Sequence, residues 1–328
     1  MENLAQNLNQ EEQFMLQKLA DFLPDRIFDA HAHFYSTQVQ PETEKINEQY
    51  GTADTVRFMQ ETKLLYGRRE VRAMMLPWPS AQLGDREVRQ RVTEWMAGEL
   101  DKAPDSVAEV YVLPTDTVED VEKLLIHPRF RGFKCYYSTS SGIDGGESNI
   151  RDFLPESAWQ VANDRGYCIT LHMMKKLSPA DPENLSYILE MTAKYPNAKL
   201  ILAHCGRGFA AWTILETARK LKGIDNIYYD LAAVSEPTQI FEVIRQAGAD
   251  HVLWGTDYPL SQLYMRPFSS GGAFFWLSKK SYPSMPCGML GIESLFAFYQ
   301  AAQMLELSRN DVENIFFNNA IRLFQLEN

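Results

Sequence analysis

The amino-acid sequence predicts a (β/α)8 TIM barrel, an α/β fold in which eight parallel strands alternate with helices. Three observations predict it. Short β-branched or aromatic runs occur eight times, segments with helical apolar spacing separate them, and no linker divides the 328 residues. We therefore expect a single domain over residues 1–328, with an extra N-terminal helix and long loops at the C-terminal face of the barrel.

The eight expected strands are the apolar runs that contain β-branched or aromatic residues. They are Ile27–Phe34, Val71–Trp78, Val107–Leu113, Gly132–Tyr137, Tyr167–Met173, Lys199–Cys205, Ile227–Ala232 and Val252–Asp257. Amphipathic stretches with helix signals stand between them, among others Arg86–Leu100, Val118–Leu125, Asn184–Tyr195, Phe209–Lys220 and Thr238–Ala247. The spacing from strand to strand leaves room for one helix each, as a barrel requires.

The two ends of the chain and two long connections complete the expected fold. Residues 1–25 carry apolar side chains at helical spacing and predict a helical extension before the first strand. Residues 308–325 predict a final, capped helix with an apolar face. The connections 35–70 and 258–289 predict long loops over the barrel mouth, where barrel enzymes build their sites.

Composition and charge limit the class of protein. With 45% hydrophobic and 23% charged residues, the chain can bury a large core. The net charge of -11 and the lack of a long basic run disfavour nucleic-acid binding. No uncharged apolar run reaches the roughly 18 residues of a membrane span. The polar, acidic start does not resemble a secretory signal, so we expect a cytoplasmic protein. The four cysteines lack CxxC spacing, and we expect them to be reduced thiols.

Four of the six histidines fall at the carboxyl ends of expected strands, where barrel enzymes bind their substrates. His31 and His33 lie two residues apart, and the two-residue period of a strand turns both imidazoles to the same face. The fifth, sixth and eighth strands end in His172, His204 and Asp257. These five side chains are therefore expected to meet at one end of the barrel.

Histidines and an aspartate in this arrangement form a donor set for a divalent cation. Zinc binds neutral imidazole nitrogens and carboxylate oxygens at about 2 Å and keeps one position open at a catalytic centre. A single strand histidine is more often a hydrogen-bonded core residue, and a bare His-x-His pattern is weak evidence. The coincidence of five strand ends favours a metal site.

Seven segments give the chain a resemblance to a known family: DAHAHF, GFKCYY, LHMM, LILAHCG, YYDLA, WGTDYP and NNAIRLF. With them it resembles the amidohydrolase-related metal-dependent hydrolases (amidohydrolase family 2), in the branch that includes non-oxidative decarboxylases. The resemblance covers nearly the whole chain after the N-terminal extension. It implies that His31, His33, His172 and Asp257 hold one divalent metal, with His204 beside it as an acid or base catalyst. The donor types favour zinc as that metal. Barrels of this family commonly form dimers, so it also implies a homodimer.

Two residues leave the number of ligands and metals open. His204 is also a candidate for a further metal ligand. Lys134 ends the fourth strand, where two-metal relatives carry a carbamylated lysine that bridges the ions. Its other interpretation, which we prefer for the one-metal branch, is a cation that contacts an anionic substrate or pairs with Asp230. Asp230 itself either orients a neighbouring group or caps the helix that follows.

The expected partner is a small-molecule substrate. Trp78, Tyr136, Lys134 and Arg207 follow or end expected strands and are the candidate substrate-binding residues. The aromatic side chains predict pocket walls, although such residues near strand ends often serve packing alone. Arg207 predicts a contact with a substrate carboxylate.

The leading hypothesis is a metal-dependent hydrolase that acts on a small ester, lactone or amide through a metal-activated water. Asp257 would accept the proton of that water, and His204 would hydrogen-bond the developing oxyanion or leaving oxygen. The alternative is a non-oxidative decarboxylase of an aromatic or unsaturated carboxylic acid, which needs the same ligands. A third hypothesis, a binding protein with a structural metal, is disfavoured because structural zinc is closed and fully coordinated.

Overall fold

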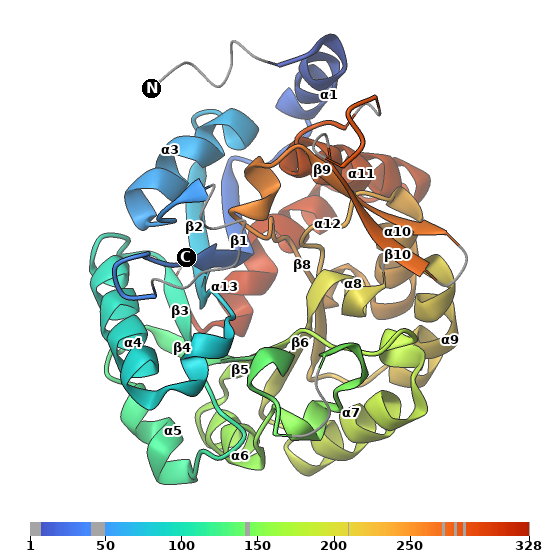
Figure 1. Cartoon of the computed structure of the whole chain (residues 1–328). Helices are drawn as coiled ribbons and strands as arrows, with labels where there is room; N and C mark the ends of the chain where they lie inside the picture. Colours follow the sequence, from blue (N-terminus) through green and yellow to red (C-terminus); the bar gives the residue numbers. More distant parts are fainter. Residues whose placement is uncertain are drawn as a thin grey trace.

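A computed structural model gives the structure of the protein. It describes residues 8–40, 50–141, 145–208, 210–270, 273–278, 281–284 and 287–327. Eight parallel strands follow one another around a barrel in the order of the sequence, and helices surround them (Figure 1). The α/β barrel that the sequence predicts is confirmed.

The barrel strands coincide with the predicted runs. They are β1 (Arg26–Phe34), β2 (Glu70–Pro77), β3 (Val107–Tyr111), β4 (Phe130–Cys135), β5 (Cys168–Leu171), β6 (Lys199–Leu202), β7 (Ile227–Asp230) and β8 (Val252–Leu253). Strands β2 to β8 all end earlier than the predicted runs. The backbone is no longer extended at the last part of the predicted sixth and eighth runs. The angle φ is +57° at His204 and +60° at Asp257.

Backbone hydrogen bonds between β1 and the segment that follows β8 close the ring. The amide of Ala30 donates to the carbonyl of Trp254 at 2.8 Å, and the amide of Asp257 donates to the carbonyl of His31 at 2.8 Å. Because these bonds join the first strand to the end of the last, the histidines of β1 and Asp257 are neighbours in space although they lie far apart in sequence.

Helices cover the outside of the barrel as the strand spacing predicts. They are α3 (Thr55–Tyr66), α4 (Arg86–Asp101), α5 (Val118–Leu124), α6 (Glu156–Arg165), α7 (Pro182–Lys194), α9 (Ala211–Leu221), α10 (Pro237–Ala247) and α11 (Leu290–Met304). The short segment α8 (Ala203–Arg207) is instead a left-handed turn that follows β6. Side-chain caps mark the start of several of these helices. The side chain of Asp85, for example, accepts hydrogen bonds from two amides at the start of α4.

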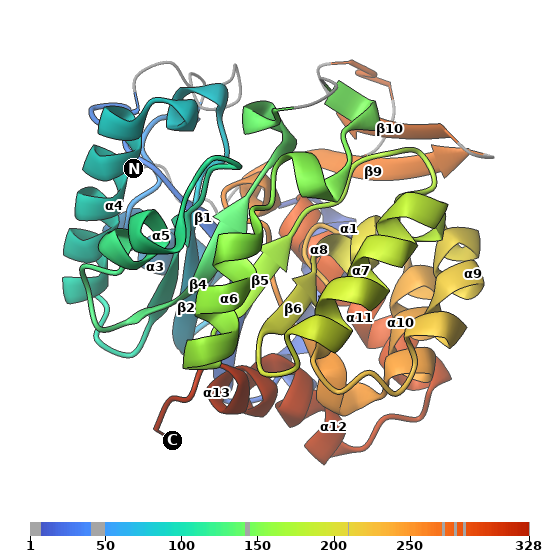
Figure 2. The same ribbon diagram turned by 90° about the horizontal axis from the view of Figure 1, so that it is seen from below.

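The two segments predicted as long loops contain secondary structure, so these predictions are wrong in part. Helix α3 lies between β1 and β2, and the side chain of Asp54 caps its first turn. After β8, the strands β9 (Met265–Ser270) and β10 (Ala273–Ser278) form an antiparallel hairpin. Pro267 disfavours a strand in the sequence, and it is tolerated here because a two-stranded hairpin consists of edge strands. Figure 2 shows the hairpin at the mouth of the barrel.

The N-terminal extension forms the predicted helix over α1 (Gln10–Ala20), and residues 1–7 lie outside the described part of the chain. Asn9 and Glu12 form a capping box at its start. The ring of Phe14 packs against that of Phe296 in α11, with centroids 6.4 Å apart. The second oxygen of Glu12 accepts a hydrogen bond from the amide of Met289 at 2.8 Å.

The C-terminal segment closes the opposite end of the barrel, which we call the floor (Figure 2). It runs through α12 (Arg309–Glu313), a π-helical turn (Asn314–Asn318) and α13 (Asn319–Leu323), as the predicted final helix does. The ring of Phe324 packs against Phe28 of β1 with a centroid distance of 5.3 Å. The same buried cluster contains Ala30, Met74, Leu76, Val107, Ile201 and Leu253. The floor is therefore apolar.

Two further expectations concern the whole chain. All four cysteines are free and buried, as expected for reduced thiols. In the part of the chain that the structure describes, no helix combines the length and the apolar character that a membrane crossing requires.

Candidate metal centre

A β-bulge in β1 brings the His-x-His pair to the barrel mouth. Over residues 29–32, β1 advances by three residues while β2 advances by two. The extra residue changes which side chains face the interior. Phe28 and Ala30 pack in the core of the floor. Beyond the bulge, His31 and His33 turn toward each other at the carboxyl end of the same strand.

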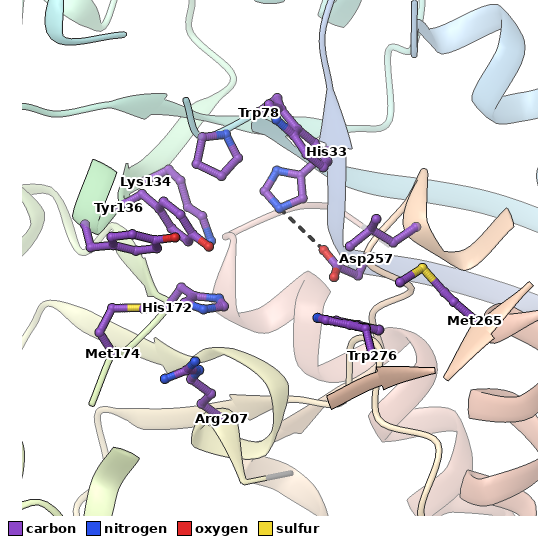
Figure 3. Close-up of a pocket in the computed structure, with 13 residues that line it drawn as sticks. His33, Trp78, Lys134, Tyr136, His172, Met174, Arg207, Asp257, Met265 and Trp276 are labelled. Carbon is purple, nitrogen blue, oxygen red and sulfur yellow. Dashed lines mark ion pairs between the residues drawn. The ribbon is translucent and has the colours of Figure 1, made fainter. Parts of the chain in front are cut away.

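The side chains of His31, His33 and Asp257 converge in a buried cluster. The Nε2 atoms of the two imidazoles lie 3.2 Å apart, and each lies 3.5 Å from Oδ1 of Asp257. One cation at about 2 Å from each atom spans such distances. The structure thus brings together three of the four predicted metal ligands, and Figure 3 shows how His33 and Asp257 face each other.

The other ring nitrogens of the two histidines contact acceptors. Nδ1 of His31 lies 2.8 Å from Oδ2 of Asp230, and Nδ1 of His33 lies 3.2 Å from the carbonyl oxygen of Pro77. A carbonyl oxygen and an ionised carboxylate can accept a hydrogen bond but cannot donate one. In both histidines, therefore, Nδ1 carries the proton and Nε2 keeps its lone pair. This arrangement orients histidine ligands at metal centres. The donor set therefore fits a divalent cation.

A second group of His31, His204 and Asp230 also has atoms close enough to share a cation. In this group, however, Asp230 already accepts hydrogen bonds. It binds Nδ1 of His31 and the backbone amide of His204, each at 2.8 Å. Asp230 is completely buried between them. These contacts agree with the orienting role that the sequence left open, and Asp230 does not cap α10, which begins after Glu236.

His172 and His204 form a pair outside the group of His31, His33 and Asp257. Nδ1 of His204 donates to the carbonyl oxygen of Ala232 at 2.8 Å, and Nε2 of His204 lies 3.1 Å from Nδ1 of His172. His172 belongs to neither of the two groups with ligand atoms in mutual range, although its ring lines the same pocket. Its role as a fourth ligand stays a prediction.

A left-handed turn after β6 positions both His204 and Arg207. Four successive residues have positive φ: +57° at His204, +55° at Cys205, +69° at Gly206 and +56° at Arg207. Such a conformation costs roughly 1–2 kcal/mol for each residue other than glycine. Strain of this kind concentrates at functional sites. Here the turn places the His204 amide on Asp230 and brings Arg207 to the pocket.

A pocket of about 460 Å³ adjoins the histidine–aspartate cluster. All four predicted substrate-binding residues line it, and Figure 3 shows Lys134 and Tyr136 on the side opposite Asp257. The complete lining is His33, Trp78, Pro79, Lys134, Tyr136, Tyr137, His172, Met174, Arg207, Asp257, Leu260, Met265 and Trp276. Metal donors, cationic groups and aromatic walls therefore share one cavity.

Burial sets the electrostatics of the site. It lowers the pKa of His31 and of His33 well below the ordinary value. Burial also raises the pKa of Asp257 to about 7, against the attraction of Lys134. The pKa of Lys134 is lowered by burial, and Glu109 and Asp230 oppose this. Neutral imidazoles are the form that binds a metal, so the environment of the two histidines favours coordination.

The sequence reasoning missed Trp276, Met265 and Glu109. Trp276 and Met265 reach the pocket from the hairpin, and the aromatic run in AFFWLS is a signal that could have found the strand. Glu109 lies inside the barrel, where burial raises its pKa to about 8 and its Oε1 accepts a hydrogen bond from Thr170 at 2.7 Å. A glutamate in the middle of the apolar run VAEVY was the signal there.

Solved structures of low sequence identity share the fold. A 5-carboxyvanillate decarboxylase from Sphingomonas paucimobilis is 12% identical, with a TM-score of 0.60 over 93% of this chain and 100% of that chain. A dihydroxybenzoic acid decarboxylase from Polaromonas sp. with bound manganese and an inhibitor is 16% identical, with a TM-score of 0.56 over 92% and 97%. An amidohydrolase from Burkholderia multivorans is 11% identical, with a TM-score of 0.61 over 92% and 99%.

A search of curated proteins found no match. The sequence profile of the amidohydrolase family, by contrast, matches residues 28–326. This range includes β1 from its third residue and all of β2 to β8. The match covers the cluster of His31, His33 and Asp257 as well as the pocket beside it. The chain therefore belongs to the amidohydrolase family.

Proposed function

We propose that this protein is a metal-dependent hydrolase that acts on a small ester, lactone or amide. The observation that carries the proposal is the convergence of two imidazole Nε2 atoms and the carboxylate of Asp257 beside a cavity of about 460 Å³. A divalent cation in such a site would lower the pKa of a bound water and polarise the carbonyl group of a substrate. We infer one ion for each chain, with zinc as the expected metal, since imidazole and carboxylate donors suit it.

Two side chains would move protons in this reaction. Asp257 would accept the proton of the attacking water and return it to the leaving group. His204 holds its Nδ1 proton on the carbonyl of Ala232, so a proton is gained or lost at Nε2. Both side chains line or adjoin the same cavity.

The cationic wall of the pocket would bind an acidic group of the substrate. Lys134 is 1% exposed and lines the cavity, as does Arg207. Nη1 of Arg207 donates to the carbonyl oxygen of Lys175 at 3.3 Å, which fixes the position of the guanidinium group. A guanidinium group binds a carboxylate with paired hydrogen bonds, and a buried ammonium group adds a point charge.

The same wall supports a second candidate, a non-oxidative decarboxylase of an aromatic or unsaturated carboxylic acid. In that reaction the bond from the substrate carbon to its carboxylate breaks, CO2 leaves, and a proton replaces it on the carbon. Two of the three solved structures described above are named as decarboxylases. Ligands of the same type serve both reactions, so the products have to distinguish them.

Metal content and product analysis test the proposal together. Purified protein should contain about one equivalent of a divalent metal, and chelation should abolish turnover until the metal is restored. A panel of small esters, lactones and amides should then release acid, which a pH-stat records, without CO2. Release of CO2 from unsaturated acids would contradict the hydrolase proposal and support the decarboxylase. Stoichiometric metal without turnover on either panel would indicate a binding protein.

The expected cytoplasmic location and homodimer remain proposals that fractionation and light scattering can test.

A further inference from the structure

The buried side chain of Asp29 joins the two segments of the chain that carry His31 and Asp257. Its Oδ1 accepts hydrogen bonds from the backbone amide of His31 at 3.2 Å and from that of Thr256 at 2.9 Å. Its Oδ2 accepts a third bond from the hydroxyl group of Thr256 at 2.5 Å. Asp29 is completely buried and does not line the pocket. It thus contacts the chain on both sides of the candidate metal centre without reaching the cavity.

Thr256 extends this connection across Asp257. Its hydroxyl oxygen accepts a hydrogen bond from the amide of Tyr258 at 3.1 Å while the hydroxyl group donates to Asp29. Asp257 lies between these two anchored residues and has a φ of +60°. Such a backbone conformation persists only where surrounding contacts impose it. The contacts of residues 256 and 258 therefore hold Asp257 in the conformation in which its Oδ1 lies 3.5 Å from the two imidazole Nε2 atoms.

The two segments approach so closely that a side chain at position 255 would collide with β1. A Cβ atom on Gly255 would lie 2.8 Å from Cβ of His31 and 3.2 Å from its amide nitrogen. Two backbone hydrogen bonds complete the contact. The amide of Asp257 donates to the carbonyl oxygen of His31 at 2.8 Å, and the amide of His33 donates to that of Tyr258 at 2.7 Å. A shift of either segment would therefore move the candidate ligands relative to one another.

The bulge in β1 gives the contact of Asp29 with His31 a specific purpose. Asp29 is the last residue in regular register with β2 before the bulge, and His31 lies within it. Regular pairing with β2 consequently does not fix the backbone of His31 there, and the side chain of Asp29 binds its amide instead. Asp230 contacts the ring of the same histidine at Nδ1. The two aspartates thus have different tasks, since one holds the backbone and the other orients the ring.

We propose that Asp29 and Thr256 are positioning residues that set the spacing between His31 and Asp257, and thereby the metal affinity and coordination geometry of the centre. This inference rests on the proposed function, because it takes a divalent cation to be bound by these ligands. Neither side chain supplies a ligand atom. Their removal should therefore weaken metal binding and change its geometry although every ligand stays in the chain.

The test compares a disruptive and a conservative variant at each position. Thr256→Val removes the hydroxyl group and keeps the shape, whereas Thr256→Ser keeps the hydroxyl group. Asp29→Ala removes the carboxylate, whereas Asp29→Asn keeps an oxygen that can accept from both amides. Competition with a chromophoric chelator gives the zinc affinity of each protein. The visible spectrum of the cobalt-loaded protein reports the coordination geometry, which a general loss of stability would not change.

The disruptive variants should lose metal affinity, and the conservative variants should keep it. Thr256→Val should bind zinc about tenfold more weakly and Asp29→Ala up to about 100-fold more weakly than the wild type, the range typical of residues that support metal ligands. Both should show an altered cobalt spectrum. Thr256→Ser and Asp29→Asn should keep the wild-type spectrum and most of the zinc affinity.

Thr93→Val provides the matched control. Thr93 is a buried threonine of α4, and its hydroxyl group donates to the carbonyl oxygen of Arg89 in the same helix at 2.9 Å. This variant should keep the wild-type zinc affinity and cobalt spectrum. An equal loss of affinity in Thr93→Val and Thr256→Val would overturn the inference, because loss of any buried hydroxyl group would then have the same effect.

Wild-type affinity and spectrum in Thr256→Val would also overturn the inference, and this variant decides the question even where Asp29→Ala does not fold. Failure of the proposed function gives a different result. A wild type that binds neither zinc nor cobalt would contradict the metal dependence itself. Normal metal binding without hydrolysis of any ester, lactone or amide would contradict the proposed reaction and leave the comparison of the variants valid.

Discussion

The two halves of strand β1 differ sharply in what they contribute. The lower half carries Phe28 and Ala30, which pack with Phe324 in the apolar floor. Beyond the bulge, the upper half carries His31 and His33, whose nitrogens contact acceptors or face a carboxylate. The floor contributes apolar burial, which stabilises the fold. The mouth buries imidazoles and carboxylates, which costs stability unless partners or a cation compensate.

The backbone follows the same division. Residues at the mouth adopt positive φ, among them His204, Arg207 and Asp257. The floor ends in a continuous helical segment with one π-helical turn. Stability and chemistry are therefore concentrated at opposite ends of one barrel. Variants at the two ends should consequently fail in different assays.

The largest effect is expected from Asp257→Asn at the mouth. The amide cannot accept the proton, so turnover should fall about 10³-fold or more, while part of the metal stays on the histidines. Steady-state rates and metal analysis of the same sample measure both. Asp250→Asn is the control, since Asp250 is a largely exposed aspartate beside the floor helix. Unchanged turnover in Asp257→Asn would exclude Asp257 as the proton acceptor.

Phe324→Ala should separate the floor from the mouth. Loss of a buried phenylalanine should lower the free energy of unfolding by about 3–5 kcal/mol, measured by urea titration. The activity of the folded fraction should not change, because Phe324 lies at the end opposite the metal ligands. The exposed Phe14 is the control, and Phe14→Ala should cost less than about 1 kcal/mol. A lower activity of folded Phe324→Ala would show that the two ends are coupled.

Asp230→Asn should weaken the centre without removing a predicted ligand. Asp230 orients His31 through Nδ1, and loss of such a contact typically lowers metal affinity about 10- to 100-fold. Competition with a chromophoric chelator gives the affinity. Asp225→Asn, at an exposed position shortly before β7, should behave as wild type. Wild-type affinity in Asp230→Asn would mean that its contact with His31 does not support the metal.

The smallest effect is expected from Arg207→Gln. Removal of the guanidinium group should reduce the affinity for benzoate about tenfold, with the metal content unchanged. Arg219→Gln in α9 is the control, because Arg219 is exposed. If both variants bind benzoate equally well, the acidic group contacts Lys134 or the metal rather than Arg207.

Local patterns were sufficient for much of the fold. Runs of β-branched residues, amphipathic periods and the capped segment after Ser308 predict the strands, the helices and the floor, since each depends on neighbours within a few residues. The hairpin β9–β10 was missed, because Pro267 and a short turn resemble a loop. The positive φ at His204 and Asp257 also could not be foreseen, since the local pattern of apolar residues predicts extended backbone there.

The sequence by itself determined that histidines and an aspartate stand at strand ends, and the period of a strand determined that His31 and His33 share a face. Only the tertiary structure decided that their Nε2 atoms meet Asp257 and that Nδ1 of His172 lies beside Nε2 of His204. The physical reason is that strand closure and hydrogen bonds with residues far along the chain set ring orientation and distance. Sequence spacing carries no information on those contacts.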